Sequence, residues 1–307
     1  MDKTYYEKAL DDKNLPLVYL IGDHYVAQLK GCLRQLSANI EIFDICNTVQ
    51  AFNLLYTGYI LRTTYPFFPA GTIHLIGVNS EPSATNKILL VKHEDHYFVG
   101  ADNGLYDIIF EDCSPESALA YELVPEMMYR FVPDLAPTTF FNPDLELNTP
   151  KQFSGFSAIK IFATVVNHIM NNKDISLLGK PVNINTEKKA PKAIIKTSSI
   201  SGNVIFIDHF GNIITNISRE LFDSVGKGRP FGIFIRGSRK FAISAISTDY
   251  SVIGHEQKYL AIFNSSGLLE IAQLHYNLAQ VESIDILADV VVNFSNEEEE
   301  TTKKLFY

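Results

Sequence analysis

The order of apolar segments in the first 80 residues constrains the fold of this chain more than any other feature. Short apolar runs at 15–21, 41–45 and 72–78 are typical of buried strands. Between them, 25–36 and 51–59 carry apolar residues at helical spacing. Strands that alternate with helices form a sheet with helices packed on it. We therefore predict an α/β domain with a mostly parallel sheet flanked by helices.

Further elements follow in the same half of the chain. Residues 87–93 and 96–100 predict a hairpin, and 105–110 predict another strand. An amphipathic helix is expected from 159 to 170, with stop residues at 178–181.

A change of pattern near residue 183 predicts a second domain. Residues 183–193 are polar, rich in lysine and interrupted by a proline, as linkers are. Beyond them, short apolar runs separated by glycines predict a compact β domain. We expect an α/β domain at 1–182, a linker at 183–193 and an all-β, barrel-like domain at 194–307.

Charge and cysteine content narrow the classes of function. The net charge is −9, and phosphate binding requires a basic surface, so we expect no nucleic-acid partner. Cys32, Cys46 and Cys113 are scattered and form no CxxC pair, which favours a reducing compartment. No apolar run reaches the about 20 residues of a membrane helix, and the polar, acidic start is unlike a secretory signal. We expect a soluble, cytoplasmic protein with no membrane partner.

Three polar motifs allow both a structural and a functional interpretation. His93–His96, HEDH, could bind a metal, but its residues should alternate faces at a hairpin tip, so we predict no metal site. Ala101–Gly104, ADNG, is first of all a turn sequence. Asn264–Gly267, NSSG, is either a strand-to-helix turn capped by serine or a nest of donors for an anion.

The stretch 206–217, FIDHFGNIITNI, carries more chemistry than a turn between strands requires. A hairpin needs only Asn-Gly or Asp-Gly. Here Asp208, Phe210 and Asn212 surround the glycine. An acid, an aromatic ring and an amide so close together indicate a role beyond the turn itself.

Five segments, taken in order, resemble one family. The sequence motifs are similar to those of the S-adenosylmethionine hydroxide adenosyltransferases, which are related to the bacterial fluorinase and chlorinase. The resemblance covers nearly the whole chain and implies an α/β domain, a C-terminal β-barrel and a homotrimer. It places the ligand between the N-domain of one subunit and the C-domain of its neighbour. The segments are DHYVAQLKG (23–31), FPAGTIHLIGV (68–78), YFVGADNGLYD (97–107), IDHFGNIITNI (207–217) and FNSSGLLEIA (263–272).

The resemblance also implies roles for single residues. Asp208, Phe210 and Asn212 fall where the family holds the amino-acid end and the adenine of S-adenosylmethionine. The chemistry fits, because a carboxylate suits an ammonium group, and a ring and an amide suit a purine. S-adenosylmethionine is the implied substrate or ligand, with no separate cofactor and no metal. The implied substrate-binding residues are Asp23, Asn79, Asp208, Phe210, Asn212, Asn264 and Ser265.

The implied reaction is an attack by water on the ribose C5′, which displaces methionine and yields adenosine. The family's acid, arginine and histidine positions hold Asn79, Asn86 and Ser157. An amide does not accept a proton near neutral pH, so we assign no catalytic residue. His275 is a candidate replacement base. Two interpretations follow: an enzyme that cleaves S-adenosylmethionine, or a non-catalytic adenosine-binding or scaffold protein on the same fold.

Overall fold

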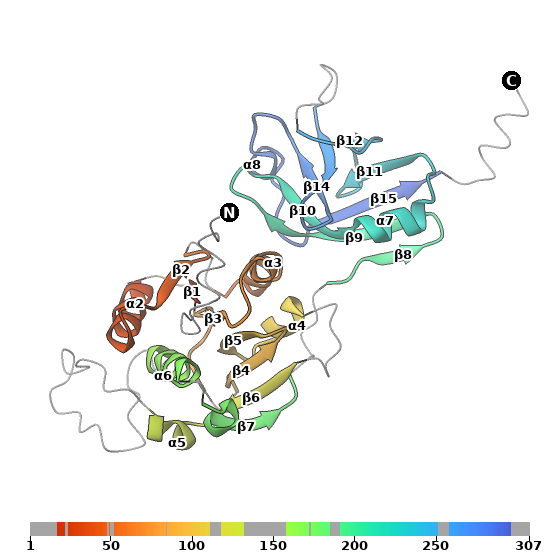
Figure 1. The fold of residues 1–307 in the computed structure, drawn as a ribbon. Coiled ribbons are helices and arrows are strands. Elements are labelled where there is room, and N and C mark those ends of the chain that lie inside the picture. The colour runs from red at the N-terminus through yellow and green to blue at the C-terminus, as the bar shows by residue number, and fades with distance from the viewer. Residues whose placement is uncertain are drawn as a thin grey trace, which may run out of the picture. The chain divides into compact units, whose positions relative to one another are not determined.

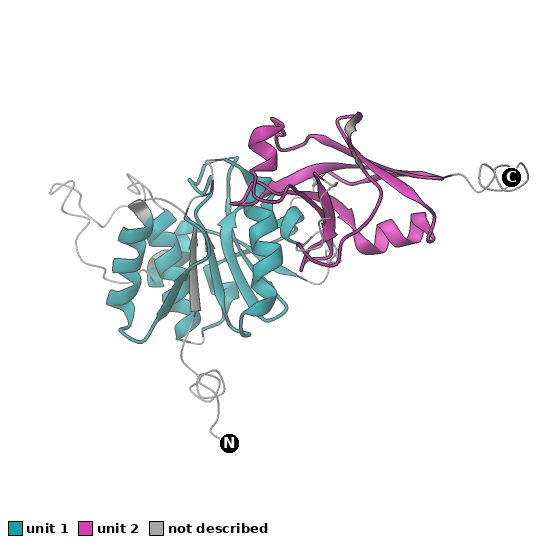
Figure 2. Cartoon of the chain, turned by 90° about the horizontal axis from the view of Figure 1, so that it is seen from above, with its two compact units in different colours: residues 1–189 teal, residues 190–307 magenta. Residues whose placement is uncertain are grey.

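The chain falls into two compact units, residues 1–189 and 190–307 (Figure 2). This computed structural model describes residues 17–21, 24–47, 49, 52–83, 85–110, 118–131, 158–171, 173–184, 191–250 and 258–295. Within these residues, no helix combines the length and the apolar character needed to cross a membrane.

A seven-stranded sheet forms the centre of the first unit (Figure 1). Its strands are β1 (Leu17–Ile21), β2 (Glu41–Asp44), β3 (Ile73–Ile76), β4 (Ile88–His93), β5 (His96–Ala101), β6 (Leu119–Leu123) and β7 (Gly179–Val182). They lie in the order β2-β1-β3-β5-β4-β6-β7.

This sheet is mixed rather than mostly parallel. The pairs β1–β2, β1–β3 and β3–β5 are parallel, whereas β4–β5, β4–β6 and β6–β7 are antiparallel. The prediction therefore describes only one half of the sheet. The reason is the two-residue turn Glu94-Asp95, which joins β4 to β5 directly, and such a short connection permits only an antiparallel pair.

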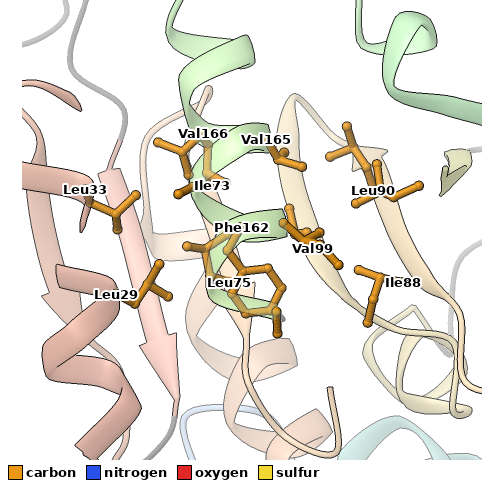
Figure 3. Packing of buried hydrophobic residues seen from close by; sticks show 14 of the residues in the cluster. Leu29, Leu33, Ile73, Leu75, Ile88, Leu90, Val99, Phe162, Val165 and Val166 are labelled. Carbon is orange, nitrogen blue, oxygen red and sulfur yellow. The ribbon is translucent and has the colours of Figure 1, made fainter. Parts of the chain in front are cut away.

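Helices cover both faces of the sheet. α2 (His24–Leu36) and α6 (Ala158–Met170) pack on one face, and α3 (Leu54–Thr64) and α4 (Leu105–Ile109) on the other. Side chains alternate along a strand, so Ile73 and Leu75 of β3 contact the first pair of helices and Ile76 the second. Figure 3 shows the first contact, with Phe162 of α6 against the sheet. Shorter helices are η1 (Tyr65–Phe67), α5 (Pro125–Met128), η3 (Tyr129–Phe131) and η5 (Ile175–Leu178).

Two predictions of local structure in this unit are wrong. Residues 105–110 form α4 and a turn, not a strand, because Gly104 adopts a left-handed φ of 93° and ends the extended chain. Tyr106 of α4 is buried, and its hydroxyl donates to the carbonyls of Leu89 and Gly100. Residues 179–182 form β7 instead of ending a helix.

The second unit is built on a curled, eight-stranded antiparallel sheet. Its strands are β8 (Ile194–Lys196), β9 (Ser199–Ile207), β10 (Ile213–Ser218), β11 (Phe231–Ile235), β12 (Ser238–Ile243), β13 (Leu260–Phe263), β14 (Leu268–Ala272) and β15 (Asp289–Phe294). The order is β12-β11-β15-β9-β10-β14-β13, and β8 pairs with β9.

The predicted β domain is confirmed in outline as a half-barrel. A bridge between Ile246 and Ala261 brings the segment after β12 against β13, the strand at the opposite edge of the sheet. Buried aliphatic and aromatic side chains from the strands fill its concave side. Two short helices, α7 (Arg219–Gly226) and α8 (Leu278–Val281), accompany the sheet.

Candidate functional site

The turn between β9 and β10 is built by the side chain of Asp208. Its Oδ1 accepts hydrogen bonds from the backbone N–H of Phe210 (2.9 Å) and of Asn212 (2.8 Å). Its Oδ2 accepts from Nδ2 of Asn212 at 3.0 Å. A carboxylate has about four acceptor positions, so these three bonds leave one on Oδ2 for a further donor. Asp208 thus both shapes the turn and keeps capacity for a cation.

Phe210 stands at the tip of this turn with 74% of its surface exposed. The ring of His209 lies edge-on to it at a centroid distance of 5.9 Å. The neighbouring Asn212 is buried. The turn therefore presents a large aromatic face to solvent on a backbone that the Asp208 carboxylate holds in place.

The far side of the turn packs against the start of α8. The carbonyl of Gly211 accepts from the backbone N–H of Ala279 at 3.0 Å. Gly211 has a φ of 83°, and a Cβ built on it would lie 2.8 Å from Cα of Asn277. Asn277 caps α8 by accepting from the N–H of Gln280. His275 is exposed in the preceding turn, with a φ of 63°.

The second motif, Asn264–Gly267, joins β13 to β14 as a hairpin turn. The prediction of a strand-to-helix turn is therefore wrong. Oδ1 of Asn264 accepts from the N–H groups of Ser266 (3.0 Å) and Leu268 (3.2 Å). These N–H groups serve the turn and are not open to an anion. The adjacent Ser265 is exposed.

A buried acid that the sequence did not single out accepts a hydrogen bond from the second turn. Glu270 of β14 is 4% exposed and accepts from the Tyr250 hydroxyl (2.5 Å) and from Nδ2 of Asn264 (3.4 Å). Burial raises the pKa of the Glu270 carboxyl; bonds from Tyr250, Asn264 and Asn212 lower it, and the charge of Asp208 raises it. A lone acid inside the apolar run LLEIA was the available signal.

Asn79 and Asn86 lie together in the first unit, in the loop after β3. Nδ2 of Asn86 donates to the backbone carbonyls of Asn79 and Glu81, both at 2.8 Å. Asn79 has a left-handed φ of 49°, a conformation that asparagine tolerates. Both amides therefore have a role in shaping this loop. Asp23 and Ser157 lie outside the described residues.

The histidines of the HEDH motif face each other across the hairpin. His93 of β4 pairs with His96 of β5, so the expectation that they alternate faces is wrong. Both are buried, together with His74, whose Nε2 lies 3.3 Å from Nδ1 of His96. Across the described ranges, no group of three or more His, Cys, Asp or Glu residues is placed to hold a metal ion.

Comparison with known proteins identifies the family. Residues 19–179 match the SAM hydroxide adenosyltransferase N-terminal domain, and residues 202–291 match its C-terminal domain. A relative named (R)-S-adenosyl-L-methionine hydrolase, from Methanocaldococcus jannaschii, is 25% identical over 93% of this chain and 97% of its own length. A fluorinase from Nocardia brasiliensis is 22% identical over 84% of this chain and 89% of its own.

The fold is shared with a solved structure as well. The crystal structure of an uncharacterized conserved protein from Thermotoga maritima superimposes with a TM-score of 0.71 at 21% identity. It covers 90% of this chain and 99% of that protein. The motif resemblance is thus confirmed by matches that span both units, and the chain belongs to the SAM hydroxide adenosyltransferase family.

Proposed function

We propose that this protein binds S-adenosylmethionine and transfers its adenosyl group to water, releasing adenosine and methionine. The observation that carries the proposal is the turn 208–212, which presents an exposed ring between a carboxylate and an amide. Phe210 stacks on the adenine, Asn212 pairs with its edge and Asp208 takes the ammonium group. These are the contacts that suit a purine and a cation.

Other residues bind the methionine end of S-adenosylmethionine in this proposal. Ser265 offers an exposed hydroxyl, and Asn264 shapes the turn that carries it. Asp23 and Asn79 complete the proposed binding set. No cofactor is required, because the sulfonium of the substrate activates its own leaving group.

The reaction proceeds by attack of a water oxygen on the ribose C5′. The C5′–S bond breaks, methionine leaves as a neutral thioether, and the water proton passes to solvent. The leaving group needs no general acid, so the site must chiefly orient the water and the C5′ centre. Asn79 and Asn86 can hydrogen-bond a water but cannot accept its proton. We therefore expect slow turnover.

Incubation of the protein with S-adenosylmethionine in H₂¹⁸O tests this reaction. We expect adenosine with one ¹⁸O at the 5′ position and unlabelled methionine, both measured by chromatography with mass spectrometry. Heat-inactivated protein is the control for spontaneous breakdown. Methylthioadenosine or free adenine as the main product would contradict attack at C5′.

A second candidate function, nucleoside binding without turnover, is favoured by the loop of Asn79 and Asn86. The amide of Asn86 already holds the backbone of Asn79 and Glu81, so it has a structural reason to be there without catalysis. Calorimetry that detects S-adenosylmethionine or adenosine binding, together with no labelled adenosine after prolonged incubation, would assign this function instead.

Phe210→Ala should weaken adenosine binding strongly. Stacking of a base on an aromatic ring contributes about 1–3 kcal/mol, which corresponds to a loss of affinity of roughly 5- to 150-fold. Titration calorimetry measures it. The matched control is Phe67→Ala, which removes another exposed ring (84% exposed) from the first unit. Equal adenosine affinity in the two variants would reject Phe210 as the stacking residue.

We also propose that the protein is a cytoplasmic homotrimer with the ligand at the subunit interface. The family resemblance supports the assembly, and the scattered cysteines support the compartment. Light scattering after gel filtration should give three times the chain mass of 34.5 kDa. A monomer at working concentration would contradict the assembly.

A further inference from the structure

Two buried polar side chains lie in the first unit at the sheet edge where the parallel strands β3 and β5 end. The two strands are neighbours, with Leu75 opposite Val99, so the segments that follow them leave the sheet at the same edge. Ser80 lies in the segment after β3, and Asn103 lies in the segment after β5. In α/β sheets, ligands bind beyond the carboxyl ends of the parallel strands.

Hydrogen bonds hold these two segments together. The side chain of Asn86 donates to the backbone carbonyls on either side of Ser80, both at 2.8 Å. The carbonyl of Lys87, the next residue, accepts from the N–H of Asp102 at 2.8 Å. Asp102 immediately precedes Asn103. Short local contacts therefore keep Ser80 and Asn103 in one small region of the unit.

Each of the two side chains has a polar atom that the described part of the protein does not pair. Ser80 is 1% exposed and Asn103 is 6% exposed. Within the described residues, neither Oγ of Ser80 nor Nδ2 of Asn103 has a hydrogen-bond partner. Oδ1 of Asn103 accepts from the N–H of Leu105 at 3.3 Å, which fixes the orientation of the amide. A buried donor without a partner destabilises a fold, so these atoms call for a small polar guest.

The chemistry of the two groups suits a single water molecule. An amide NH₂ group only donates hydrogen bonds, whereas a hydroxyl also accepts them. A water between the two side chains accepts from Nδ2 of Asn103 and donates one proton to Oγ of Ser80. It keeps one lone pair and one proton for a third partner, and about three hydrogen bonds are usual for a buried water.

We propose that Ser80 and Asn103 bind one water molecule and that this water attacks the ribose C5′. The inference rests on the proposed function, because it needs the ribose to lie against the loop that begins at Asn79. The free lone pair forms the O–C5′ bond, the electron pair of the C5′–S bond stays on sulfur, and one water proton passes to solvent. Neither side chain accepts that proton near neutral pH, which agrees with slow turnover.

A Ser80→Ala variant separates this catalytic role from a structural one. The substitution removes one hydrogen bond to the reacting water and none that the described protein makes. Loss of orientation should lower the single-turnover rate of adenosine formation about 10- to 100-fold. The dissociation constant for S-adenosylmethionine, measured by calorimetry, should not change. The melting temperature should not fall, because no protein group loses its partner.

Thr164→Val is the matched control for loss of a buried hydroxyl. Thr164 of α6 is also 1% exposed, but its hydroxyl donates to the carbonyl of Lys160 at 2.7 Å, within the same helix. This variant should form adenosine at the wild-type rate. Wild-type turnover by Ser80→Ala would overturn the inference. A loss of rate that comes with an equal loss of S-adenosylmethionine affinity would also overturn it, because the role would then be structural.

A crystal structure of the unaltered protein tests the water site even if Ser80→Ala does not fold. We expect one ordered water within about 3.2 Å of both Oγ of Ser80 and Nδ2 of Asn103. Protein that forms adenosine but has no water there would overturn the inference alone. Protein that holds the water but forms no adenosine would overturn the proposed function, and the catalytic role of the water with it.

Discussion

A Gly211→Ala variant should lose both stability and adenosine binding. Alanine at a φ of 83° is strained, which costs about 1–2 kcal/mol. Its Cβ would also meet the capping oxygen of Asn277 and lie 2.8 Å from its Cα, and forcing such a contact apart costs about 1–3 kcal/mol. Together these effects should lower the free energy of unfolding by about 2–5 kcal/mol.

The same displacement should move the turn on which Phe210 stands. The carbonyl of Gly211 is bonded to the N–H of Ala279, so a shift away from α8 breaks that bond and tilts the ring and the Asn212 amide. Thermal unfolding and adenosine titration measure the two losses. Gly237→Ala is the matched control, since Gly237 has a φ of 66° in the same unit and open space around its missing Cβ.

The control separates the strain from the clash. Gly237→Ala should cost only the about 1–2 kcal/mol of left-handed strain and should bind adenosine as the wild type does. Should Gly211→Ala match Gly237→Ala in both stability and affinity, the contact with Asn277 would have no role in holding the turn.

In the first unit, the spacing of apolar residues predicted the strands and helices well wherever the local sequence determines the type of element. Ile73 and Leu75 alternate with His74 and Ile76, and this period of two is visible in the sequence alone. Whether two neighbouring strands pair parallel or antiparallel is harder to predict, because it depends on the chain segments that join them. The turn Glu94-Asp95 is short enough to predict an antiparallel pair, yet β6 and β7 add to that edge through contacts distant in sequence.

Helix α4 shows where local reasoning fails for a physical reason. The run of Leu105, Tyr106, Ile108 and Ile109 is apolar enough for a strand or for a buried helix. The outcome is decided by Gly104, which turns the chain, and by packing of α4 against α3 across Gly58. A Cβ on Gly58 would contact the side chain of Ile108 too closely, so the two helices depend on each other.

In the candidate site, too, some residues could be predicted from the local sequence and others could not. Asp208, Phe210 and Asn212 could be singled out because an acid, a ring and an amide are more than a turn requires, and the structure shows them on one turn. Glu270 is far from them in sequence, and only the pairing of β10 with β14 places it opposite Ile214, two residues after Asn212. The hairpin form of Asn264–Gly267 likewise depends on β13 and β14 finding each other.

Acidification should destabilise the first unit through His74. This ring is buried, stacks on Phe98 at 4.7 Å and lies edge-on to Tyr65 at 6.3 Å. Burial, with a smaller effect of His96, lowers the pKa of His74 from its ordinary value of 6.5 to about 3. The unfolded chain therefore binds a proton that the folded chain excludes, throughout the interval between these two pKa values.

The sign of the effect follows from that difference. The stability associated with neutral His74 is fully present above pH 6.5 and is lost progressively as the pH falls towards 3. For His74 alone the loss between pH 7 and pH 5 amounts to about 2 kcal/mol. The pKa of His96 is lowered as well, chiefly by burial and in small part by His93, and the charges of Glu94 and Asp95 offset this only in part, so His96 adds to the loss.

His74→Phe should remove the His74 share of this acid sensitivity. Phenylalanine preserves the ring against Phe98 and does not titrate, so the loss of unfolding free energy between pH 7 and pH 5 should shrink by about 2 kcal/mol. Urea titrations at both pH values measure it, with His209→Gln as the control because His209 is exposed. Phenylalanine cannot be protonated, so position 74 contributes nothing to acid sensitivity in the variant. If the variant lost as much stability between pH 7 and pH 5 as the wild type does, His74 would not be the source of the loss.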